Sequence, residues 1–334
     1  MKKTKKSDAE EYLSFPKRAL TWAKNNKSSI IPYFGLVLCL LIFSIVPPIL
    51  GNGTMWTPIF MDTFINASLT LFIISLGAIF IYSMGSMDIS VGAMAGVISI
   101  VIPVVATASG SIFLGFLVGI IIAVVCAMIN ATIGEALHLP AVIGSIFLMF
   151  FAGGIQTLYF SSHDSVNLPN YYAIFKDPWF QAGFVVVFLA LTFYLFKFTK
   201  LGKYTRAIGS NVTVARQSGV NVWLYKVLAY SYLGVAVVIA SFFSIHRTIT
   251  ATVSTGSSYH MNIMLALILG GMPLSGGMKS RVSAAVIGTI VFNMLDFGLS
   301  KCLVPSSMIP FVKAFILFII IVVTCRKKTT TLQR

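Results

Sequence analysis

The sequence predicts an all-α, polytopic membrane protein with about ten transmembrane helices. Hydrophobic residues make up 57% of the 334 residues, charged residues make up only 10%, and the mean hydropathy is +0.91. In a soluble domain about a quarter of the residues are charged. Apolar runs of roughly 20 residues recur from Ile30 onward, and each can cross a ~30 Å hydrocarbon core as a helix.

The apolar runs give the predicted spans in chain order. They cover residues 30–50, 64–82, 91–108, 112–133, 141–160, 180–198, 223–245, 261–272, 282–299 and 306–325. The alternating ~10-residue segments typical of a membrane β-barrel are not found in the sequence. The chain therefore divides into an N-terminal segment, residues 1–29, a transmembrane domain, residues 30–325, and a C-terminal tail, residues 326–334.

The net charge of +15 is unevenly distributed. Basic residues concentrate in the N-terminal segment, in the polar insert 201–222 and at the start of the C-terminal tail. The positive-inside rule therefore predicts that both termini and the insert are cytoplasmic, whereas the polar segment 161–178 faces outside. This pattern indicates topology and contact with anionic lipid headgroups, and it does not favour nucleic acid binding.

Two glycine-rich interruptions of the apolar pattern are similar to each other. GSMDISVG at residues 85–92 and GGMPLSGG at residues 270–277 share Gly, Met, Ser and Gly at aligned positions. Broken helices at membrane depth occur where they are buried or line a cavity, so paired breaks indicate a duplicated transporter. Two unrelated helix ends rich in small residues are the alternative. The span count places both breaks in the cytoplasmic half as a parallel repeat, whereas an error of one span would make the repeat inverted.

Asp88, inside the first interruption, has two interpretations. An acidic residue at membrane depth predicts an acceptor for a polar substrate or an ion. A helix cap instead predicts that the carboxylate accepts bonds from the N–H groups of Ser90 and Val91, and we favour this second interpretation. In the run 142–160, Phe147 and its aromatic neighbours are suited to stacking on a sugar ring in a pathway, although packing explains them equally well.

The sequence shows no pattern for catalysis, metal binding or nucleotide binding. The histidines His163, His246 and His260 lack metal-ligand spacing. The second interruption resembles a phosphate-binding loop, but that template requires Lys directly after its second Gly, whereas Gly277 and Met278 precede Lys279. We therefore expect neither an enzyme nor a nucleotide site in this chain.

Four motifs together resemble the permease subunits of bacterial ABC importers for ribose-type sugars, a group that includes autoinducer-2 and nucleoside permeases. Residues 85–92 are similar to G-G-[IV]-D-L-S-V-G, with Ser86 in place of the second Gly. Asn130 and the Leu-Pro pair at 139–140 resemble N-G…L-P-x-F-I-A-T-L, with Ala131 replacing the Gly. Residues 201–220 are similar to F-G-R…A-I-G-G-N…A-A-R…S-G-I, and residues 270–277 to G-G-x-S-x-x-G-G.

The resemblance covers most of residues 64–325 and implies an import permease for a sugar or sugar-like solute in the bacterial cytoplasmic membrane. It implies a second permease subunit, ABC ATPase subunits that bind ATP and Mg²⁺, and an extracytoplasmic solute-binding protein, with no cofactor bound by this chain. Residues 199–222 would form the ATPase coupling loop, in which glycines make tight turns and cations orient the loop towards the partner or the headgroups. The candidate loop residues are Gly202, Lys203, Arg206, Gly209, Asn211, Ala215, Arg216 and Gly219. The candidate pathway residues are Gly85, Asp88, Ser90, Gly92, Phe147, Gly271, Ser275 and Gly277.

The alternative is a stand-alone secondary transporter or channel for a small polar solute, driven by an ion gradient. Several paired acids and cations inside the membrane would favour it. The sequence offers only Asp88, Asp296 and Lys313 as candidates. A membrane-embedded enzyme is a third option, and the lack of a catalytic spacing weakens it.

Overall fold

The computed structural model describes residues 27–137, 139–169 and 173–325. The predicted cytoplasmic segment 1–29 lies outside the described residues except for its last three, with which the first helix begins, and the tail 326–334 lies wholly outside them. The described residues are almost entirely helical, so the predicted all-α fold is confirmed.

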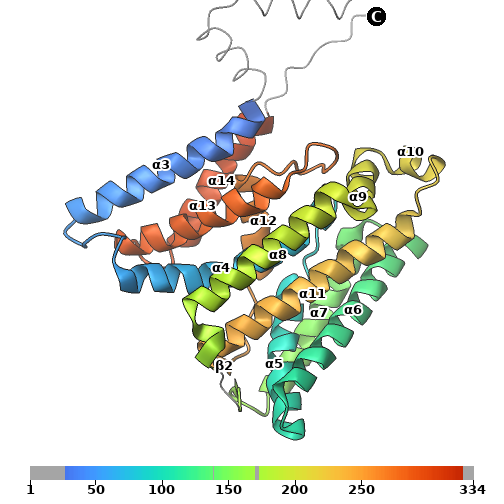
Figure 1. Ribbon diagram of the computed structural model, residues 1–334, viewed down its shortest axis with the longest axis horizontal. Helices are drawn as coiled ribbons and strands as arrows, with labels where there is room; N and C mark the ends of the chain where they lie inside the picture. The colour runs from blue at the N-terminus through green and yellow to red at the C-terminus, as the bar shows by residue number, and fades with distance from the viewer. Residues whose placement is uncertain (1–26, 138, 170–172, 326–334) are drawn as a thin grey trace, which may run out of the picture.

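The elements follow one another as a series of antiparallel helices with short connections (Figure 1). The helices are α3 (Lys27–Ile49), α4 (Pro58–Ser83), α5 (Val91–Ser109), α6 (Ile112–Ala136), α7 (Ala141–Phe160), α8 (Pro178–Phe198), α9 (Lys200–Ser210), α10 (Val212–Gln217), α11 (Val222–Thr248), α12 (Tyr259–Leu269), α13 (Val282–Lys301), α14 (Ile309–Cys325) and the short 3-10 helix η1 (Ala173–Lys176). Two short strands, β1 (Val166–Asn167) and β2 (Thr250–Ala251), pair antiparallel with Val166 opposite Ala251. Within the described residues, eight helices are long and apolar enough to cross a membrane, and α12 and α14 are shorter apolar helices.

Four helices form the core of the molecule. About two thirds (67%) of the apolar stretch is buried in each of α4, α5, α11 and α13, against 17% in α3, 22% in α8 and 28% in α6 and α7. The exposed side chains of the outer helices are themselves largely apolar, and they include Phe34, Phe113, Phe150 and Val187. An apolar exterior around a hydrogen-bonded helical interior is the arrangement that a bilayer requires.

Helix starts and ends follow local sequence signals. Asn221 caps α11 by accepting a bond from the N–H of Leu224 at 3.1 Å, and Asp177 caps α8 through the N–H of Phe180 at 3.3 Å. Pro178 occupies the first turn of α8, where its missing N–H costs nothing. Gly110 lies in the left-handed conformation and ends α5.

The molecule has two distinct ends. One, here called the basic end, carries α9, α10 and the 270–281 connection, and the opposite one, the strand end, carries β1 and β2. In Figure 1, α9 and α10 lie at the upper right and β2 lies near the lower edge. Because consecutive helices alternate in direction, the ends of α4, α6 and α8 and the start of α11 share the basic end.

Helix α12 begins inside the bundle. Its 11 residues span about 16 Å, roughly half of a hydrocarbon core. The segment before it contacts the start of α5, since a Cβ added at Gly92 would lie 2.5 Å from the carbonyl oxygen of Gly256. The predicted span at 261–272 is therefore present only as a half-length helix, and the chain from β2 to Gly256 completes the crossing.

Candidate functional site

The two glycine-rich interruptions meet at the basic end. The N–H of Gly277 donates to the carbonyl oxygen of Ser83, at the end of α4, over 2.8 Å. A Cβ added at Gly85 would lie 2.7 Å from the carbonyl oxygen of Ser275, so the two backbones are in direct contact. Both interruptions thus lie on one end of the molecule, as the span count predicted, while the duplication itself stays a prediction.

The end of α9 packs onto this meeting point. A Cβ added at Gly209 would lie 2.0 Å from the carbonyl oxygen of Ser83 and 2.7 Å from the N of Gly277. No side chain fits in that space, because real Cβ atoms do not approach a backbone so closely. Residues 83–85, 209 and 275–277, here called the glycine junction, therefore join the predicted coupling loop directly to both interruptions.

The predicted turns in the coupling loop are wrong for two of the three glycines. Gly202 and Gly209 lie within α9. A Cβ added at Gly202 would lie 2.0 Å from the carbonyl oxygen of Phe196, so no larger residue fits there. Only Gly219 makes a turn, with a φ of +81° after the end of α10. Gly202 and Gly209 are required because backbone atoms of other segments lie where a Cβ would be, and not because the chain turns there. A hydropathy pattern cannot show such contacts.

The side chains of Arg206 and Lys203, both in α9, point to different surroundings. Arg206 is turned into the protein: its Nε donates to the carbonyl oxygen of Gly202 at 2.8 Å, and its guanidinium lies 5.0 Å from the ring centroid of Phe196. Lys203 is exposed. Two of the Arg206 donors are thus used within the α8–α9 hairpin, and its orientation towards a partner or the headgroups stays a prediction.

Helix α10 is held by three of the predicted residues. Asn211 caps it by accepting a bond from the N–H of Val214 at 3.0 Å, and Ala215 is buried. Arg216 pairs with Glu135 at the end of α6. Arg216 therefore binds within the chain, although its side chain stays 55% exposed.

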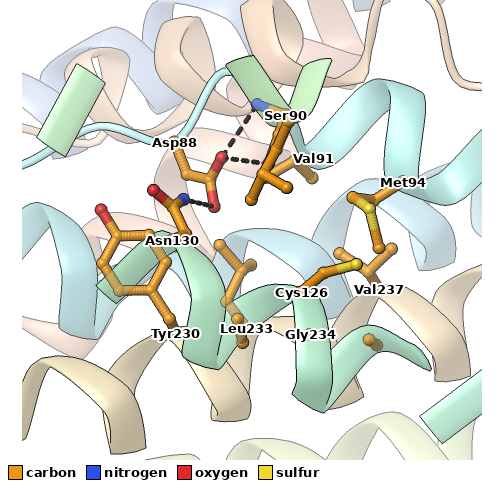
Figure 2. Close-up of a pocket in the computed structure, with 13 residues that line it drawn as sticks. Asp88, Ser90, Val91, Met94, Cys126, Asn130, Tyr230, Leu233, Gly234 and Val237 are labelled. Carbon is orange, nitrogen blue, oxygen red and sulfur yellow. Dashed lines mark hydrogen bonds between the residues drawn. The ribbon is translucent and has the colours of Figure 1, made fainter. Parts of the chain in front are cut away.

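Asp88 lies in the extended segment between α4 and α5 and is partly buried (Figure 2). One carboxylate oxygen accepts bonds from the N–H and the hydroxyl of Ser90, at 2.8 and 2.6 Å, and the other accepts a long bond from Asn130 of α6 at 3.4 Å. The expected bond from Val91 is thus replaced by the Ser90 hydroxyl. The N-cap residue of α5 is Ser90, so the favoured cap interpretation of Asp88 holds only for its bond from the Ser90 N–H. Asp88 instead forms an Asx turn three residues before the first residue of α5, and it holds the start of α5 against α6.

The cavity beside Asp88 is small. It has a volume of about 30 Å³ and lies between the side chains of Asp88, Asn130, Met94 and Tyr230 (Figure 2). Such a space holds about one water molecule, whereas pockets for small molecules measure ~300–1,000 Å³. In this conformation Asp88 supports the backbone and does not line a space of solute size.

A larger hollow lies on the exposed face of α7. It is a shallow region of about 640 Å³ that is open to the exterior, and it is lined by α7 and its C-cap alone, through Met149, Phe150, Gly153, Gly154, Thr157, Leu158 and Ser161. Phe147, one turn earlier, is 56% exposed and stacks on Phe151 at 6.2 Å. The structure therefore places Phe147 on an outer face and does not bring it to Asp88.

The remaining pathway candidates are distributed around the interruptions. Gly92 packs against Gly256, Ser90 bonds to Asp88, and Gly271 and Ser275 are exposed in the second interruption. In the described part of the chain, no group of three or more His, Cys, Asp or Glu side chains could hold a metal ion.

Sequence reasoning missed two residues that tie the site together. Gln156 of α7 donates to the carbonyl oxygens of Thr252, Val253 and Thr255, at 3.4, 2.9 and 3.1 Å, and so holds the segment that leads into α12. Glu135 binds Arg216 and Lys226. Each is an isolated polar residue near a helix end, and that isolation is the one sequence signal that points to them.

The predicted intramembrane acids and cations form one pair. Lys313 donates to Asp296 at 2.7 Å and lies 4.4 Å from the ring centroid of Phe292, with 11% of its side chain exposed. The pair joins α13 to α14. Lys313 therefore faces its neighbouring helix, and no contact connects it to Asp88.

Replacing Asp88 with Asn should leave most stability and uptake in place. The amide oxygen still accepts from Ser90, so the loss should be on the order of 1 kcal/mol or less. Thermal unfolding in detergent and uptake by reconstituted vesicles measure the two properties. A folded Asp88→Asn protein with uptake near zero would show that transport needs the charge itself.

Comparison with known proteins identifies the family. The family described as "Branched-chain amino acid transport system / permease component" matches residues 60–324. The ribose import permease protein RbsC of Bacillus subtilis (strain 168) is 29% identical over 306 residues, covering 89% of this chain and 92% of the relative. RbsC of Escherichia coli (strain K12) is 25% identical over 326 residues, with 92% and 95% covered.

A further relative is the autoinducer 2 import system permease protein LsrC of Photorhabdus laumondii, which is 24% identical over 258 residues, covering 75% of this chain and 77% of the relative. No solved structure matches the chain. These relatives are transport permeases and not enzymes. Since the matched region runs from α4 to α14, the chain belongs to this permease family, and its resemblance to sugar importer permeases is confirmed.

Proposed function

We propose that the chain is the membrane-spanning subunit of an ATP-driven importer for a sugar or sugar-like solute. The observation that carries the proposal is the glycine junction, where the end of α9 packs without side chains onto both interruptions. A force applied to α9 and α10 from outside the membrane would reach the starts of α5 and α13 through backbone contacts. Two discrete arrangements of these contacts would give alternating access.

The charge distribution supports a cytoplasmic basic end. The described residues at that end include Lys197, Lys200, Lys203, Arg206, Arg216, Lys226, Lys279 and Arg281. The strand end carries Asp62, Asp164, Asp177 and Asp296 together with Lys176, Arg247, Lys301 and Lys313, so its charges nearly balance. Under the positive-inside rule α9 and α10 then face the cytoplasm, and so do both termini.

The partners follow from this orientation and from the family. ATPase subunits would dock on α9 and α10 and would bind ATP and Mg²⁺ themselves. A solute-binding protein would deliver solute at the strand end. A second permease subunit would pack on an exposed helix face, and lipids would cover the others.

The alternative, a stand-alone secondary transporter, needs ionisable groups along its pathway. Asp88 is instead held by Ser90 and Asn130 beside a cavity of about 30 Å³, and the Asp296–Lys313 pair lies between α13 and α14. Neither Asp88 nor the Asp296–Lys313 pair lines a path along which an ion could pass the two glycine-rich interruptions.

The test is reconstitution of the chain with its ATPase and solute-binding protein in lipid vesicles, using ribose as the first probe. We expect uptake that requires ATP. In a cysteine-free background, a cysteine at Ser210 should cross-link to the ATPase, whereas one at Ser165, beside β1, should not. Uptake driven by an ion gradient without ATP would favour the secondary transporter, and cross-linking at Ser165 alone would reverse the orientation.

A further inference from the structure

One carboxylate ties together three helices at the basic end. Glu135, next to last in α6, binds Arg216 of α10 through Oε1 and Lys226 of α11 through Oε2, the latter at 2.6 Å. The side chains of Glu135 and Lys226 are 19% and 20% exposed. Trp223 of α11 adds a neutral link, since its Nε1 donates to the hydroxyl of Thr132 at 3.3 Å. The last turn of α6 is thus fixed to both α10 and α11.

The pairing is selective. Within the described residues, the basic end presents many cations, but Glu135 is the one carboxylate there besides Asp88 in the first interruption. It binds one cation from the segment α9–α10 and one from the core helix α11. Exposed cations such as Lys203 and Lys279 also lie at this end, but Glu135 pairs with neither of them.

The same helix reaches the first interruption. Asn130 precedes Glu135 by five residues, about 7.5 Å along the axis of α6, and donates to Asp88 just before α5. Contacts therefore run from α10 through Glu135 to α6, and from Asn130 through Asp88 to α5. This route is separate from the glycine junction, which approaches the interruptions from α9. Contiguous contacts become coupling only if a change at one end shifts the equilibrium at the other.

We propose that Glu135 is a positioning residue for the transport cycle, which transmits movement of α10 to α6 and so to the start of α5. The proposal rests on the function proposed above. Arg216 is more than half exposed, so the Glu135–Arg216 pair adds little to folding stability. Glu135 and Lys226 are largely buried, so loss of the Glu135 charge also leaves Lys226 without its partner and lowers stability. Loss of the Arg216 charge should therefore affect coupling without affecting folding, and it separates the two effects.

The test uses the reconstituted complex of permease, ATPase and solute-binding protein. Glu135→Gln keeps the shape and removes the charge. We expect a folded protein with a lowered melting temperature, normal association with the ATPase and basal ATP hydrolysis within about twofold, but at least a fivefold fall in solute-stimulated hydrolysis and uptake. Arg216→Gln removes only the half-exposed pair, so it should leave the melting temperature unchanged and still lower stimulation at least fivefold. The double variant should lose no more than Glu135→Gln alone, because Glu135→Gln already removes the interaction with Arg216.

Lys279→Gln is the matched control, since it removes an exposed cation from the basic end outside α9 and α10, and it should leave stimulation unchanged. Full stimulation in Glu135→Gln would overturn the proposal. Equal losses in Lys279→Gln and Arg216→Gln with an intact Glu135→Gln would also overturn it, and would show that these cations contact the ATPase or the headgroups directly. Loss of ATPase association in Glu135→Gln would assign the residue to docking. A wild-type complex without ATP-driven uptake would instead contradict the proposed importer function, and the role proposed for Glu135 would fall with it.

Discussion

Gly209→Ala should lower solute-stimulated ATP hydrolysis and uptake by about tenfold, the effect of about 1.4 kcal/mol at the coupled step. The added Cβ would overlap the carbonyl oxygen of Ser83 and crowd the N of Gly277, both of them backbone atoms that no rotamer change can move. The end of α9 must then move away from both interruptions. Hydrolysis by the reconstituted complex, with and without solute, measures the effect.

The control for this variant is Gly183→Ala in α8, where a Cβ has no heavy atom within 4 Å. Both substitutions raise helix propensity equally, so a difference between them reports the contact alone. Membrane insertion and ATPase association should be retained in both proteins. Normal stimulation in Gly209→Ala would remove the glycine junction from the coupling mechanism.

Gly288→Ala should destabilise the fold itself. A Cβ at Gly288 of α13 would lie 1.8 Å from the carbonyl oxygen of Ala266 in α12, and Gly270 makes the reciprocal contact with Ala284 at 1.8 Å. The two helices thus pack through small residues with their backbones in contact. Inserting a methyl group into such a contact costs about 1–3 kcal/mol.

Thermal unfolding in detergent measures this loss, which should appear as a clear fall in melting temperature. The control is Gly154→Ala on the exposed face of α7, where a Cβ meets nothing within 4 Å. An unchanged melting temperature in Gly288→Ala would mean that α12 and α13 separate readily, and that their contact does not stabilise the native state.

The sequence was sufficient for eight of the ten predicted membrane spans, and the other two are present in the described residues as the shorter apolar helices α12 and α14. The lengths of the eight spans and the composition of their connections predicted α7 at residues 141–160 and α5 from residue 91, because apolar length is the property that a membrane selects. It was also sufficient for Asp88 as a local acceptor, since an Asx turn depends on residues two positions apart.

Contacts between distant segments were not predictable in this way. Gly209 was assigned to a turn because glycine is permissive in φ, whereas the structure uses its lack of a Cβ against Ser83. The contacts of Arg206 within its own hairpin are likewise not visible in a hydropathy pattern, because they depend on how α8 and α9 pack. Glu135 was overlooked because its partners are 81 and 91 positions away.

The half-length of α12 sets an order of events during synthesis. A membrane sorts nascent segments by apolar length, and 11 residues are too few to be retained as a span by lipid alone. Helix α12 packs chiefly on α13 and also on α4 and α5. Because α13 leaves the ribosome after α12, we expect the half-helix to gain its main contacts only once residues 282–301 have entered the bilayer. A chain interrupted between residues 269 and 282 should therefore keep α12 only on its smaller contacts with α4 and α5.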